Sequence, residues 1–245
     1  MPVFITHTRG DWPEGAVVID WSASGRRVDS DVERQIEIAW SAAKARLGDR
    51  LFDGSMCRLE RWDASPARLR LTVSRTGYKA FVGTNMTSSE LPADVLASPV
   101  GVSSALQSSD GWLLLGQRNA WVASHPNRVH PFAGALEPAE GLNVFDEVRR
   151  ELCEELGFSF DDVAMIRCLG LIENLALRQP ELVFHVTSPR TRAEIEAKLD
   201  CAEHDGTWAI RATRADVASA LTDPALTPVA VGTLSLWMES PLAPR

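Results

Sequence analysis

The segment Arg149–Phe158, RRELCEELGF, concentrates carboxylates at helical spacing. Glu151, Glu154 and Glu155 occupy positions i, i+3 and i+4, which place three acidic side chains on one side of a helix. Like charges at these spacings repel by roughly a few tenths of a kcal/mol per pair. A bound cation would remove this repulsion, and charged oxygen ligands suit Mg²⁺ or Mn²⁺ rather than zinc. The segment therefore indicates a metal site; the alternative is an acidic helix face exposed to water.

An apolar stripe on the same helix can hold these carboxylates in place. Phe145, Val148, Leu152 and Leu156 recur at helical spacing, and Glu147 extends the acidic stripe beside them. We expect the apolar stripe to pack on a sheet, so that the acids lie rigidly at its margin.

Strand and helix patterns interleave along the whole chain, which favours an α/β or α+β fold. The Ser-, Pro- and Ala-rich segment 87–99 is the best linker candidate. We therefore expect a smaller α/β domain at 1–95 and a second domain at 96–245. A capping box of Ser30 and Glu33 should open the first helix. The patterns predict strands at 17–21, 56–62, 68–74, 100–106, 111–115, 168–171, 182–186 and 207–210, and helices at 30–47, 78–82, 191–199, 214–221 and 229–238.

The composition narrows the functional classes. A net charge of −8 argues against non-specific nucleic-acid binding, which needs a basic surface. The longest apolar run is too short to span a membrane, and no signal peptide is visible. Four cysteines without metal-ligand spacing indicate free thiols in the cytoplasm, and the five histidines are expected to be surface or core residues.

The acidic segment resembles the second half of the Nudix box of nucleoside-diphosphate-linked hydrolases. AGALEPAE, residues 133–140, looks like its first half, with five residues between Gly134 and Glu140. Ala133 stands where the family usually has glycine, and nine residues rather than seven separate Glu140 from Arg150. The runs 69–85 and 98–118 are similar to the UDP-glucose pyrophosphatase-like subgroup. This resemblance implies an α/β/α sandwich with a mixed sheet, preceded by the smaller domain.

The resemblance also implies roles for individual residues. Glu151, Glu154, Glu155 and the Gly134 carbonyl would hold Mg²⁺ or Mn²⁺, and Glu154 and Glu155 would thereby take part in catalysis. The general base would be a box glutamate or a later acid, for which Glu203 is preferred and Glu173 and Glu181 are alternatives. Arg150, Glu140 and Gly157 would support the box structurally. Phosphate or nucleoside contacts would come from Arg118, Arg128, Asn85 and Trp121, although each could equally be a structural residue.

The implied activity is hydrolysis of UDP-glucose or UDP-galactose to UMP and sugar 1-phosphate. Two alternatives stay open: the same chemistry on ADP-ribose, NADH or a coenzyme A derivative, and a non-catalytic module that senses a nucleotide. The expected partner is a small nucleotide, with neither nucleic acid nor membrane, and a homodimer is the candidate assembly.

Overall fold

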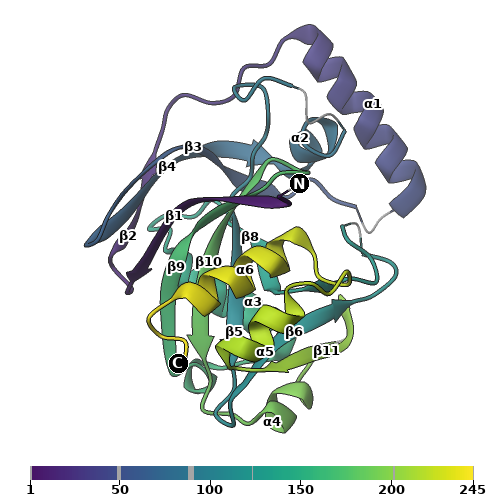
Figure 1. Ribbon diagram of the computed structural model, residues 1–245. Coiled ribbons are helices and arrows are strands. Elements are labelled where there is room, and N and C mark those ends of the chain that lie inside the picture. Colours follow the sequence, from purple (N-terminus) through teal and green to yellow (C-terminus); the bar gives the residue numbers. More distant parts are fainter. Residues whose placement is uncertain (1, 49–50, 88–90, 123, 201, 245) are drawn as a thin grey trace.

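The computed structural model describes residues 2–48, 51–87, 91–122, 124–200 and 202–244 (Figure 1). Its strands form a sheet of eight and a sheet of three. The strands are β1 (Phe4–Trp12), β2 (Val17–Trp21), β3 (Ser55–Ser65), β4 (Arg68–Gly77), β5 (Gly101–Gln107), β6 (Trp112–Arg118), β7 (Val129–His130), β8 (Phe132–Ala135), β9 (Met165–Asn174), β10 (Gln179–Thr187) and β11 (His204–Arg211). The helices are α1 (Ser30–Leu47), α2 (Tyr78–Gly83), α3 (Val144–Leu156), α4 (Arg192–Glu196), α5 (Arg214–Ala220) and α6 (Pro228–Glu239), with a 3-10 turn, η2, at Phe160–Asp162.

The larger sheet is mixed, as expected. Its order is β1-β9-β10-β5-β6-β11, while β8 pairs with β5 and β7 pairs with β6. Strands β10 and β5 run parallel, and the other neighbouring pairs run antiparallel.

Both faces of this sheet are covered by helices. Successive residues of β10 point to opposite faces, so Phe184 packs with Phe145 and Leu152 of α3, whereas Val183 packs with Leu234 of α6. Figure 1 shows α5 and α6 together over one face of the sheet. The predicted α/β/α arrangement and the apolar anchoring of the acidic helix are therefore confirmed.

The smaller sheet, β2-β4-β3, packs on the α3 side of the larger one. Leu69, Leu71 and Val73 of β4 are fully buried in the same hydrophobic cluster as Phe145 and Leu152. The sequence patterns located all three strands, although β3 and β4 are longer than expected. The two sheets consequently share one core.

Strand β1 was not expected from the sequence. It forms an edge of the larger sheet by pairing with β9, from Phe4↔Asn174 to Trp12↔Cys168. The proposed division into 1–95 and 96–245 therefore assigns one strand of the larger sheet to the first part. A second difference concerns α1, which Asp29 rather than Ser30 caps, since the Asp29 carboxylate accepts from the backbone N–H groups of Asp31 and Val32. No helix in the described ranges has the length and apolarity needed to cross a membrane.

Candidate active site

Local signals at both ends define the acidic helix α3. The Asn143 side chain accepts a hydrogen bond from the Phe145 N–H at 3.0 Å, which caps the first turn. Gly157 follows the last turn with φ +59°, a left-handed conformation that favours glycine, and its N–H donates to the Cys153 carbonyl at 2.9 Å. Gly157 thus ends the helix where the acidic segment ends.

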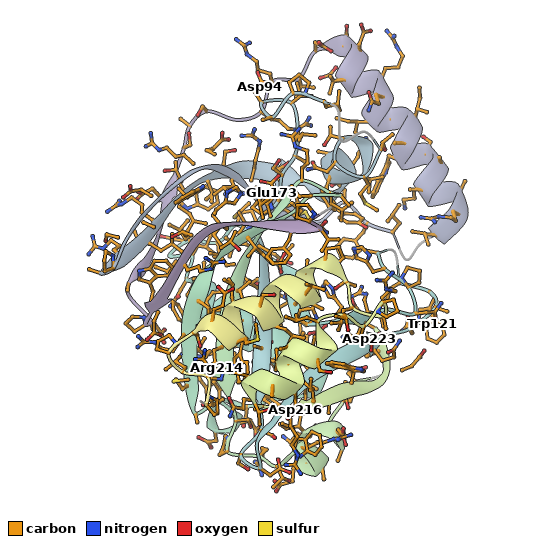
Figure 2. All side chains as sticks on the ribbon, viewed as in Figure 1. Asp94, Trp121, Glu173, Arg214, Asp216 and Asp223 are labelled. Carbon is orange, nitrogen blue, oxygen red and sulfur yellow. The ribbon has the colours of Figure 1, made fainter. Side chains whose placement is uncertain are left out.

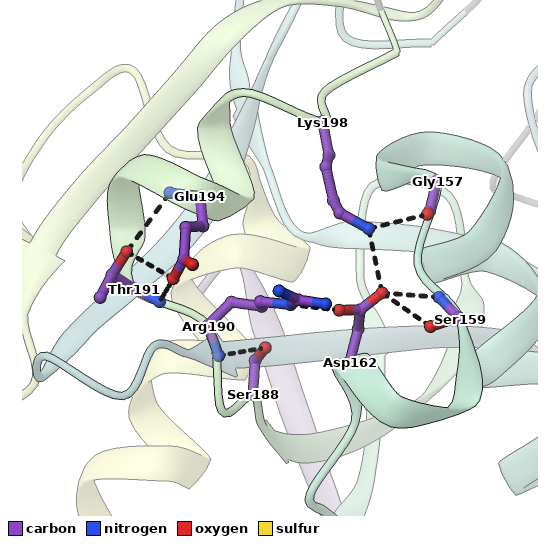
Figure 3. A network of polar contacts seen from close by, with 8 residues as sticks. All are labelled: Gly157, Ser159, Asp162, Ser188, Arg190, Thr191, Glu194 and Lys198. Carbon is purple, nitrogen blue, oxygen red and sulfur yellow. Dashed lines mark hydrogen bonds and ion pairs between the residues drawn. The ribbon is translucent and has the colours of Figure 1, made fainter.

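A polar network fixes the chain beyond this helix end (Figure 3). Asp162, fully buried in η2, accepts from the Ser159 N–H at 2.8 Å, from Arg190 at 2.5 Å and from Lys198 at 3.1 Å. Lys198 also donates to the Gly157 carbonyl at 3.4 Å. These bonds hold the C-terminal end of α3 against the segment between β10 and β11.

Glu155 is buried and its two carboxylate oxygens have different partners. Oε2 accepts from the Ala133 N–H at 3.1 Å, and Oε1 lies 2.8 Å from His204 Nε2. Burial raises the pKa of Glu155 well above its usual range, and burial lowers the pKa of His204 to about 4. Burial therefore disfavours the charged form of both groups.

Glu151, one turn earlier on α3, lies against Gly134 of β8. A Cβ at Gly134 would lie 1.8 Å from Glu151 Oε1, so only glycine allows this close approach. Burial raises the pKa of Glu151 to about 8; Arg150 lowers it and the neighbouring Glu155, Glu154 and Glu147 raise it further. The loop and helix halves of the acidic motif therefore meet at this contact.

Arg150 connects the carboxylates of α3. Its guanidinium donates to Glu147, Glu151 and Glu154, with a distance of 2.7 Å to Glu154 Oε1. Glu154 itself is exposed on the outer side of the helix. The structure thus joins Arg150 to the acids as expected, whereas Glu140 is exposed in the preceding loop.

The donor types at this site fit a hard divalent cation. Glu151, Glu154 and Glu155 offer carboxylates, and glycine at 134 leaves room for one of them against the loop. No three His, Cys, Asp or Glu side chains among the described residues converge on a ready-made metal site. Glu151 and Glu154 are instead bound to Arg150, so ligation would require them to change partners.

A cavity of about 480 Å³ is lined by Ala133 and Gly134, the neighbours of Glu155 and Glu151, although the carboxylates of α3 themselves are not among its lining residues. One wall comes from the N-terminal part of the chain and includes Leu51, Phe52, Met56, Tyr78 and Phe81. The other lining residues include Arg118, Trp121, Gly134, Glu181 and Glu203. Trp121 is 55% exposed and lies at the outer edge of the molecule (Figure 2). An elongated ligand could therefore contact both parts of the chain.

The candidate general bases differ in their surroundings. Glu203 is about half exposed and pairs with Arg118 Nη2 at 3.3 Å, and its charge also contributes to the raised pKa of Glu155. Glu181 is buried on β10, where burial raises its pKa to about 8 and the charge of Glu151 raises it further. Glu173 pairs with His7 of β1 at 2.9 Å. The structure brings Glu181 and Glu203 to the cavity, but Glu173 is not among the lining residues.

Two expected ligand-binding residues have structural contacts instead. Arg128 donates to the backbone carbonyls of Ala225 at 3.0 Å and Leu226 at 2.7 Å. Asn85 is buried and donates to the carbonyls of Leu177 at 2.8 Å and Arg178 at 3.2 Å. Neither residue lines the cavity, whereas Arg118 and Trp121 do. No sequence pattern indicates the contact of His204 with Glu155, because the two residues are 49 positions apart.

The amino-acid sequence was compared with protein-family models and with known proteins. No family model matches the chain. Over 158 residues, it is 27% identical to the human uridine diphosphate glucose pyrophosphatase, an alignment that covers 51% of this chain and 52% of that protein. The two-part acidic motif that meets at Gly134 and Glu151 is similar to that of Nudix proteins. The chain spans about half the length of this human relative.

Solved structures align with part of this chain. A MutT protein from Methanosarcina mazei aligns with a TM-score of 0.39 and 18% identity, over 57% of this chain and 91% of that one. A Nudix hydrolase from Nitrosomonas europaea gives 0.37 and 18%, over 57% and 87%. A Deinococcus radiodurans protein gives 0.44 and 19%, over 56% and 81%.

The close approach at Gly134 leads to a first prediction. Replacing Gly134 with Ala should force the flexible Glu151 carboxylate out of its position, because the new Cβ would overlap Oε1. We expect the unfolding free energy to fall by about 1 kcal/mol. Metal-dependent turnover should fall about 100-fold, the cost of a misplaced group. Thermal melting and steady-state kinetics measure both. Gly206→Ala on β11 is the matched control, since nothing lies within 4 Å of its added Cβ; equal kinetic losses in both variants would contradict the assignment.

Proposed function

We propose that this protein is a divalent-metal-dependent hydrolase of the diphosphate bond in a nucleoside diphosphate sugar. The observation that carries the proposal is the position of Glu151 and Glu155, which are buried next to Gly134 and Ala133 of a cavity that Arg118 also lines. Buried carboxylates with raised pKa values are typical of functional sites, and here they coincide with the Nudix-like acidic motif.

The proposed reaction is attack of water on one phosphorus of the diphosphate. The oxygen of water bonds to phosphorus, the bond from phosphorus to the bridging oxygen breaks, and UMP and sugar 1-phosphate separate. When bound, Mg²⁺ or Mn²⁺ would stabilise charge on the phosphate oxygens and lower the pKa of water. Glu151, Glu154, Glu155 and the Gly134 carbonyl would hold the ion, and Arg118 would donate to phosphate oxygens.

Glu203 and Glu181 are the two candidates for accepting the proton from water. Glu203 lies at the cavity wall and is held by Arg118, and its exposure keeps it accessible to water. Glu181 is buried and burial raises its pKa to about 8, as is typical of a general base that acts near neutral pH. We prefer Glu203, which is also the candidate favoured by the sequence analysis. Its carboxylate pairs with Arg118, the proposed phosphate ligand.

Similarity to the human uridine diphosphate glucose pyrophosphatase supports UDP-glucose or UDP-galactose as the substrate. The cavity volume and its aromatic side chains are compatible with a nucleoside and a sugar at the two ends of a diphosphate. Trp121 is our candidate for stacking on the base. ADP-ribose, NADH and coenzyme A derivatives remain alternative substrates, and a non-catalytic nucleotide sensor remains the alternative class.

A substrate panel tests this proposal. Purified protein with Mg²⁺ should release UMP and sugar 1-phosphate from UDP-glucose or UDP-galactose, measured by chromatography. Turnover of ADP-ribose, NADH or a coenzyme A derivative alone would overturn the substrate assignment. Tight nucleotide binding without hydrolysis of any compound would favour the sensor.

Several further expectations belong to this proposal. The division at residue 95, the cytoplasmic location and the homodimer stay predictions, as does the absence of nucleic-acid and membrane partners. The described Cys57, Cys153 and Cys168 are free thiols, which agrees with a reducing compartment.

A further inference from the structure

His204 occupies a buried position directly behind Glu155. It is the first residue of β11 and is fully buried. Its Nε2 atom lies 2.8 Å from Glu155 Oε1, on the opposite side of the carboxylate from the Ala133 N–H that reaches Oε2. Two groups from different strands therefore fix the rotation of one carboxylate.

Phe132 and Gly116 pack closely against the imidazole ring of His204. Its neighbour Phe132 presents a ring at 5.5 Å and 78°, an edge-to-face contact. On the adjacent strand, a Cβ at Gly116 would lie 2.3 Å from His204 Cε1 and Nδ1. The ring can occupy this position only because residue 116 is glycine, so its orientation is set by the packing of β6 and β11.

The hydrogen-bond partners of the two ring nitrogens indicate which of them carries the proton of His204. Nδ1 is buried and has no hydrogen-bond partner among the described residues. A proton on Nδ1 would be a buried donor without an acceptor, which costs about 1–3 kcal/mol. The single proton of the neutral ring therefore belongs on Nε2, and His204 donates to Glu155.

We propose that His204 is a positioning residue that orients Glu155 for a divalent cation. The inference rests on the proposed function, because it takes Glu155 as a metal ligand. By donating to Oε1 while Ala133 donates to Oε2, His204 restricts the carboxylate to one orientation before the cation arrives. Loss of such supporting hydrogen bonds typically costs about 10- to 100-fold in metal affinity or activity.

A pair of amide variants separates this role from simple packing. In His204→Gln the amide nitrogen can reach the position of Nε2, whereas in His204→Asn it stops near the position of Nδ1. Mn²⁺ binding to the full chain, measured by electron paramagnetic resonance without nucleotide, should weaken about 10- to 100-fold in His204→Asn and much less in His204→Gln. The Mg²⁺ concentration for half-maximal turnover should shift in the same order.

Two outcomes would overturn the proposal: wild-type Mn²⁺ affinity in His204→Asn, or equal losses in both variants. If His204→Asn does not fold, His204→Ala with added imidazole provides the second measurement, and imidazole should restore Mn²⁺ affinity in a saturable manner. No restoration would count against the proposal. Failure of the proposed function is distinguishable, because a wild-type protein that binds Mn²⁺ but hydrolyses no nucleotide would still show the difference between the variants.

Discussion

Replacing both Glu154 and Glu155 with Gln should abolish turnover by at least ~100-fold while the fold remains intact. These carboxylates are proposed to hold the cation that stabilises the transition state, and amides bind hard cations far more weakly. Gln at 155 has nearly the same shape as Glu and can still accept from the Ala133 N–H, which protects the local packing. Steady-state kinetics and Mn²⁺ titration measure the loss, and circular dichroism checks the fold.

The two single variants show which carboxylate contributes more to turnover, and a third variant on the same helix serves as the control. Glu155→Gln should account for most of the loss, because Glu155 is buried next to Ala133 of the cavity lining whereas Glu154 is exposed and bound to Arg150. Asp146→Asn, also on α3, lies in the first turn and pairs with Arg149 at 2.8 Å, away from the site. It should retain wild-type kinetics. Undiminished activity in the double variant would refute the metal assignment.

Replacing Asp162 with Asn should give the largest loss of stability. The carboxylate accepts from Ser159, Arg190 and Lys198 in a fully buried position, and the amide can satisfy only part of this network. We expect the unfolding free energy to fall by about 2–4 kcal/mol. For a chain of this size the melting temperature should fall by about 5–15 °C. Thermal denaturation measures the change.

The pH dependence of this loss provides a second measurement. The Ser159 N–H is the main cause that holds the pKa of Asp162 far below its usual range, with Arg190 and Lys198 also lowering it. A carboxyl with a lowered folded pKa stabilises the protein fully above its unfolded pKa of about 4, and this stabilisation is lost as pH falls toward the folded value. The difference between wild type and Asp162→Asn should therefore shrink below about pH 4.

The neighbouring acid supplies the control for both measurements. Asp161 is exposed in the same turn, so Asp161→Asn should change the melting temperature little. A difference between wild type and Asp162→Asn that stays constant from pH 7 to about pH 2 would contradict the role of the ionised carboxylate.

Features encoded by local spacing were predictable from the sequence. The periodicity of Phe145, Val148 and Leu152 located α3 and its buried face, and the positions of Glu151 and Glu155 on that helix followed directly. Such local patterns locate the start of a helix only to within about one residue. Ser30 and Glu33 fit a capping box, but Asp29, one residue earlier, accepts the capping hydrogen bonds of α1.

Features that depend on distant strand pairing were not predictable in this way. The contact of His204 with Glu155 requires β11 to lie beside β6 with a register irregularity between His204 and Gly206, and no local pattern records that register. Arg128 illustrates the opposite error. A cation in a loop before Gly134 suggested a phosphate ligand, yet its guanidinium bonds to the carbonyls of Ala225 and Leu226, almost 100 positions later.

The residues that line the cavity come from two parts of the chain, and only one of these parts carries the acidic helix. Phe52, Met56, Tyr78 and Phe81 belong to a layer that supplies none of the α3 carboxylates. Substitutions in that layer can reshape the space available to a ligand without altering the acidic helix. Relatives could thus acquire new preferences during evolution while the same hydrolytic apparatus is inherited unchanged.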